Sequence, residues 1–127
     1  MIFAFLICCI PTVVHVLNDA HGDTKKGNDI LVLTAISIVL STVIHFTFHI
    51  ALWKSLLMIF AIHTLVFDYA IVYFLRKNDV ISPTAKVWSY TGKSTRWWDQ
   101  LVAKVHPVLR FFIRVAVFSL AVWYWVK

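Results

Sequence analysis

The chain has 127 residues, of which 61% are hydrophobic and only 14% are charged. Soluble domains are about 45–50% apolar and about 25% charged, so this composition excludes an ordinary soluble fold, and its many aromatic residues exclude disorder. Two cysteines and three glycines exclude a disulfide scaffold, a zinc-finger array and a collagen-like chain.

Four apolar segments follow one another along the chain, at residues 2–19, 30–53, 55–75 and 106–126. A helix needs about 20 residues to cross a hydrocarbon core about 30 Å thick. The sequence therefore predicts an all-α, polytopic membrane protein: a single domain, 1–127, folded as a bundle of four transmembrane helices. A tight hairpin is expected at 51–55, and the loop 76–105 joins the third segment to the fourth.

The basic residues predict the orientation in the membrane. The loops after the first and third segments share a side, and together they carry eight of the 12 Lys and Arg residues. The positive-inside rule places these loops in the cytoplasm and both termini outside. The net charge of +6 is then explained by anionic lipid head groups beside the loops, and no nucleic acid is expected as a partner.

Ionisable side chains are costly inside a bilayer, so each one suggests a function. His45 and His49 are four residues apart, a spacing that lets two imidazoles on one helical face bind one metal ion. In a hairpin that turns near 53–54, His63 would lie level with His45, so the three are predicted to form a zinc, iron or copper site. His45 and His63 could also be the axial pair of a b-type haem. Hydrogen bonds between helices are the structural alternative.

Asp68 follows His63 by five residues, which places the two side chains about 140° apart around a helix. An ion pair between Asp68 and Arg110 or Arg114 of the last segment is therefore expected, because charges inside a membrane usually pair.

A second polar group is predicted at the cytoplasmic face, formed by His15, Asp19, Asp99 and His106. Two imidazoles and two carboxylates suit zinc, manganese or iron, and solvated interface residues are the alternative. The helix rise puts His45 about 24 Å from that face. The two groups therefore predict either two sites, or one site and one structural cluster.

The order of these motifs resembles a family of small four-helix bacterial and phage membrane proteins of unknown function. That family is akin to membrane-bound metal-dependent hydrolases, and its members carry HxxxD, HxxxH, a His–Asp pair and DQ…H on successive segments. Here the His–Asp pair is five residues apart where four is usual, and the gap from Asp99-Gln100 to the last histidine is longer. The resemblance implies a bacterial inner membrane and metal roles for His15, Asp19, His45, His49, His63, Asp68, Asp99 and His106.

Three functions remain open. In the first, a divalent metal activates water for a hydrolase at the cytoplasmic face, with Asp19 or Asp99 as general base. The second is a membrane anchor that binds haem b. The third is a small pore, a holin-like protein or an accessory subunit of a larger complex. Four short helices bury little interior, so a homo-oligomer or a partner subunit is expected in each case.

Overall fold

The computed structural model describes residues 1–19, 28–77, 101 and 104–127. Its long elements are α1 (Ile2–Asp19), α2 (Asn28–Phe48), α3 (Leu52–Lys77) and α5 (Pro107–Val126). These elements agree with the four predicted apolar segments in number and order. The prediction of an all-α fold is confirmed for the described part of the chain.

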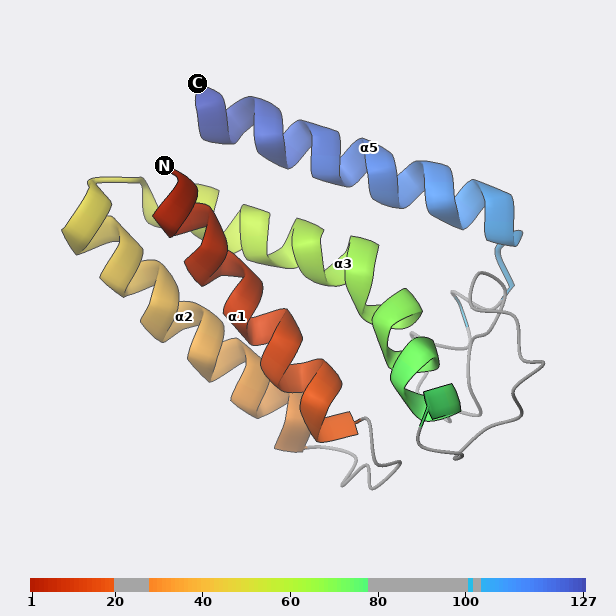
Figure 1. Ribbon diagram of the computed structural model, residues 1–127. Coiled ribbons are helices and arrows are strands. Elements are labelled where there is room, and N and C mark those ends of the chain that lie inside the picture. The colour runs from red at the N-terminus through yellow and green to blue at the C-terminus, as the bar shows by residue number, and fades with distance from the viewer. Residues whose placement is uncertain (20–27, 78–100, 102–103) are drawn as a thin grey trace.

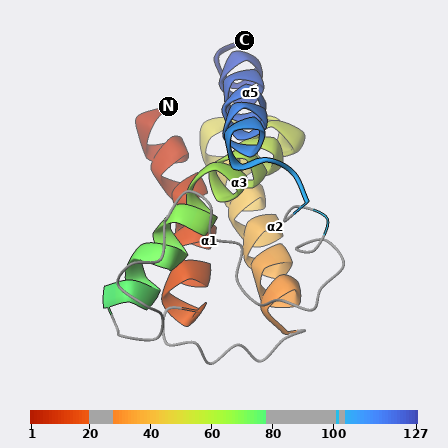
Figure 2. The same cartoon turned by 90° about the vertical axis from the view of Figure 1, so that its right-hand side faces the viewer.

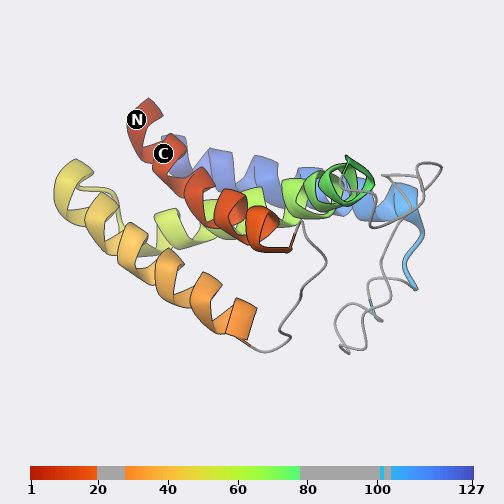
Figure 3. The same cartoon turned by 60° about the horizontal axis from the view of Figure 1, so that its bottom comes forward.

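Helix α3 lies at the centre of the arrangement. It packs against α1, α2 and α5, and α1 also packs against α2. The helices α2 and α5 lie at opposite edges (Figures 1 and 3), and Figure 2 shows α3 between α5 and the α1–α2 pair. Both termini and the turn from α2 to α3 gather at one end of the molecule (Figure 1). Consequently α1 and α3 run in the same direction, while α2 and α5 run in the opposite direction.

The start of α5 follows from its sequence. Pro107 occupies the first helical position, where its missing N–H costs nothing. His106 is the N-cap, and its Nδ1 accepts a hydrogen bond of 3.3 Å from the backbone N–H of Val108. One of the unpaired donors of the first turn is thereby satisfied.

The turn from α2 to α3 lies earlier than predicted. The hairpin was expected at 51–55, but α2 ends at Phe48 and α3 begins at Leu52. His49 adopts a left-handed backbone conformation with φ of 56°, and His45 Nδ1–H donates a hydrogen bond of 2.9 Å to the Ile50 carbonyl. A left-handed residue ends a helix. The usual glycine signal is absent here, because a histidine takes that conformation and an imidazole bonds the turn.

Replacing His49 with glycine is expected to raise the free energy of unfolding by up to about 1 kcal/mol, because glycine adopts the left-handed conformation without steric cost. The measurement is SDS-induced unfolding of the purified protein in detergent micelles. Ala35→Gly, on the exposed side of α2, is the control and should destabilise by about 0.5–1 kcal/mol. Equal losses in the two variants would contradict the left-handed conformation of His49.

Small side chains allow α1 to pack closely within the bundle. Ala4 and Cys8 are one turn apart and fully buried, and Thr12 follows one turn later. Such small residues let helix backbones approach. Cys8 is buried as a small apolar residue, whereas the neighbouring Cys9 is only half-buried. The core draws on all four helices and consists of Ala4, Cys8, Ile44, Met58, Ile59, Ala61, Ile62, Ala121 and Trp125.

Two of the described helices are long and apolar enough to cross a membrane, through the windows Leu31–Phe48 and Pro107–Val126. Only 17% of each window is buried in the fold, so these helices are not enclosed as the core helix of a soluble protein would be. The apolar stretches of α1 and α3, Ile2–Leu17 and Leu52–Phe67, are shorter.

Candidate functional site

Two histidines from different helices meet between α1 and α3. His15 Nδ1 lies 2.8 Å from His63 Nε2, the distance of a hydrogen bond. One of these two nitrogens therefore carries the proton and the other offers its lone pair. This contact joins residues 48 positions apart in the sequence.

Phe67 covers the two imidazoles. Its ring stacks on His15 with centroids 4.3 Å apart and on His63 with centroids 4.7 Å apart. The imidazole planes are themselves inclined by only 14°. Phe67 follows His63 by four residues on α3, so the two side chains share a face. The result is a pair of polar nitrogens with an apolar wall on one side, and we call His15, His63 and Phe67 the imidazole pair cluster.

The parallel course of α1 and α3 explains why these histidines meet. His15 lies thirteen residues after the start of α1, and His63 lies eleven residues after the start of α3. Equal helix rise therefore brings them to nearly the same depth. Their equal depth was not predicted, because the expected turn at 51–55 placed His63 level with His45. The earlier turn corrects this register, and the structure pairs His63 with His15.

His45 and His49 lie at the turn between α2 and α3. His45 donates to the Ile50 carbonyl, and His49 is exposed after the last residue of α2. The HxxxH spacing predicts that His45 and His49 share one helical face. They do not share a continuous one, because α2 ends before His49. Within residues 1–19, 28–77, 101 and 104–127, no three His, Cys, Asp or Glu side chains lie close enough together to hold one metal ion.

The other predicted ligands are placed only in part. Asp19 is the last residue of α1 and Asp68 lies within α3, but both side chains lie outside the described ones, and Asp99 lies outside the described residues. His106 caps α5. The predicted pairing of Asp68 with an arginine therefore stays a prediction.

Helix α5 places two arginines on its side that faces α3. Arg114 holds its guanidinium carbon 5.4 Å from the ring centroid of Tyr69 on α3. Arg110, one turn earlier, is only 7% exposed. Tyr69 follows His63 by six residues, so the two point about 120° apart around α3. The arginines and the imidazole pair cluster therefore occupy different sides of that helix.

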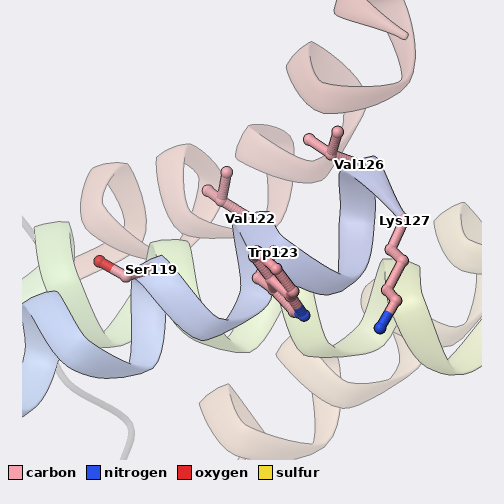
Figure 4. Close-up of a pocket in the computed structure, with 5 residues that line it drawn as sticks. All are labelled: Ser119, Val122, Trp123, Val126 and Lys127. Carbon is pink, nitrogen blue, oxygen red and sulfur yellow. The ribbon is translucent and has the colours of Figure 1, made fainter.

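A shallow groove of about 460 Å³ lies near the other end of α5. Val122 and Val126 point to the same side of the helix there (Figure 4). Lys127 Nζ lies 5.4 Å from the ring centroid of Trp123. Among its lining side chains only that of Lys127 is ionisable, and none is a histidine, cysteine or carboxylate that would bind a metal ion. Ser119, Val122, Trp123, Val126 and Lys127 line it.

No protein-family model, curated protein or solved structure matches this chain. The site must therefore be judged from its own geometry. The sequence singled out His15 and His63 separately but did not bring them together, and it gave no role to Phe67. The signal that could have joined the two histidines was their similar distance from the starts of two helices that run in the same direction.

Proposed function

We propose that this chain is an integral membrane protein that binds a divalent transition-metal ion between α1 and α3, with His15 and His63 as two of the ligands. The observation that carries the proposal is the 2.8 Å separation of the two imidazole nitrogens. Nitrogen ligands lie about 2.0–2.1 Å from zinc, so two ligands of one tetrahedral ion are about 3.3 Å apart, and a small outward movement of the two imidazoles would admit the ion between them. Imidazole also suits copper, iron and nickel.

Sequence spacing supplies a third ligand for this proposal. Asp19 follows His15 by four residues on α1, a spacing that favours a shared helical face. A set of two histidines and one carboxylate is typical of catalytic zinc and non-haem iron sites. The resemblance to membrane-bound metal-dependent hydrolases points to the same residue types.

The surroundings support a reactive site. Phe67 stacks on both imidazoles, which fixes the ring planes and keeps water from one side of the pair. A divalent ion held there would supply Lewis acidity for hydrolysis. The substrate in this proposal is lipid-borne or reaches the cytoplasmic face of the membrane.

Four membrane spans are part of the proposal. Two helices, α2 and α5, contain apolar windows long enough to cross a membrane, and the shorter apolar stretches of α1 and α3 would be the other two spans. At the end that holds both termini, Trp53 packs edge-to-face on Tyr124 with centroids 5.4 Å apart, and Lys54 lies 5.8 Å from the Trp53 centroid. Aromatic and basic side chains together are typical of a membrane–water interface. The loops at the other end carry most of the basic residues, which favours a cytoplasmic location for them.

The test is metal analysis by mass spectrometry on the detergent-purified protein. Near-stoichiometric zinc, manganese, iron or copper is expected in the wild type, and His15→Ala and His63→Ala should each lower the content at least about tenfold. The matched control is the double variant His45→Ala/His49→Ala, which should retain the metal because both residues lie at the α2–α3 turn.

Two outcomes would overturn the proposal. One is a wild type without metal after purification and titration with each ion. The other is loss of metal from the control and retention in the His15 and His63 variants. A visible spectrum of the same sample tests the haem alternative, since a Soret band would identify a haem protein instead.

A further inference from the structure

We propose that Arg110 is the central residue of a binding site for a phosphate group, with Arg114 contributing from the next turn of α5. This site is independent of the metal proposal, because it lies on another side of α3. The ligand is a phosphate ester or inorganic phosphate, and the chemistry of recognition is the same for both.

The first step is the burial of Arg110. Its side chain is only 7% exposed, and its Nε meets no hydrogen-bond acceptor in the part of the chain that the structure describes. Buried polar groups are nearly always paired, and a buried charge without a partner is strongly destabilising. An unpaired, buried guanidinium nitrogen therefore points to an acceptor that the described residues do not supply, and we assign that acceptor to a bound phosphate.

The second step is the balance of charge between α3 and α5. Helix α5 contains Arg110 and Arg114 but no Asp or Glu, and Asp68 is the only carboxylate in α3. One carboxylate can neutralise one of the two guanidinium groups. Helices α3 and α5 then offer no carboxylate to the other guanidinium group, and Arg114 already lies against Tyr69.

The third step is the position of Arg110 on its helix. It lies three residues after Pro107, the first residue of α5, or about 4.5 Å along the axis. The amino end of a helix attracts anions through its dipole. A guanidinium group matches two oxygens of a phosphate at once. In the proposed orientation, this end of α5 lies at the cytoplasmic head groups, where phospholipid phosphates are found.

The experiment measures thermal unfolding of the full chain in micelles of dodecyl maltoside, a detergent that carries no phosphate. The two probes are phosphatidylglycerol, added to the micelles, and inorganic phosphate, added to a buffer that otherwise contains none. Binding to the folded state raises Tm. Phosphatidylglycerol is expected to raise the Tm of the wild type, and Arg110→Gln should weaken the apparent affinity about tenfold or more, because a charge-assisted bond is lost. Lys127→Gln, which removes a cation from the other end of α5, is the control and should respond like the wild type.

The arms of the experiment separate the sources of the phosphate. A response to phosphatidylglycerol alone identifies a lipid site, and a response to inorganic phosphate alone identifies a soluble ligand. No response of the wild type to either probe would overturn the proposal, as would an unchanged response in Arg110→Gln. If Arg110→Gln does not fold, Arg110→Lys is measured in its place, because lysine keeps the charge but cannot bind two phosphate oxygens in the way that a guanidinium group does. Weaker binding in that variant supports the site, and unchanged affinity overturns it.

Discussion

Replacing Met58 with alanine is expected to lower the free energy of unfolding by about 2 kcal/mol. Met58 is 1% exposed and belongs to the core cluster on α3. In water-soluble proteins such truncations cost about 2–5 kcal/mol, from lost transfer free energy and from the cavity left behind. Helices that separate within lipid remain in an apolar solvent, so the transfer contribution is small. The low end of the range is therefore expected.

The measurement is unfolding in mixed micelles by titration with SDS. Leu56→Ala is the matched control, since Leu56 lies on the same helix but is 38% exposed. Its side chain faces lipid in the proposed arrangement, and the control should change stability by less than about 0.5 kcal/mol. Comparable losses in the two variants would show that Met58 is not enclosed by the bundle.

Replacing Cys8 with phenylalanine is expected to force α1 away from its neighbours and to separate His15 from His63. Cys8 has no exposed surface, and it lies seven residues before His15, which places both on one face of α1. Overpacking of a well-packed core costs about 1–3 kcal/mol. A displacement of about 1 Å would already stretch the 2.8 Å separation of His15 Nδ1 and His63 Nε2 beyond the range of a hydrogen bond.

Two measurements check this expectation. Unfolding in SDS reports the loss of stability, and the ¹⁵N resonances of the histidine side chains report the loss of the bond between His15 and His63. Cys8→Ala is the control, because it keeps a small side chain and should preserve the histidine signals. If Cys8→Phe retains those signals and full stability, then α1 and α3 are not in close contact at this level.

Helix content was predictable because it depends on local properties of the sequence. Long apolar segments and the position of Pro107 determine where α1 and α5 lie, and the structure agrees with both. The end of α2 was not predictable, since no glycine or proline marks it. A left-handed His49 and the hydrogen bond from His45 to Ile50 decide the turn, and both depend on the three-dimensional arrangement.

The site was predictable only as a set of residue types. Ionisable side chains in apolar segments identify His15, His63 and Arg110 as costly and therefore informative. Their partners depend on register, and a turn that lies a few residues earlier changes which side chains share a depth.

The sequence by itself therefore determined an apolar, all-helical chain with histidines and arginines placed along its helices, because composition and helix length are local. The tertiary structure alone decided that α1 and α3 pack side by side, that His15 meets His63 beneath Phe67, and that Arg110 is buried. These features depend on contacts between distant segments. The packing of side chains and the position of one turn determine such contacts, and no glycine or proline in the sequence marks that turn.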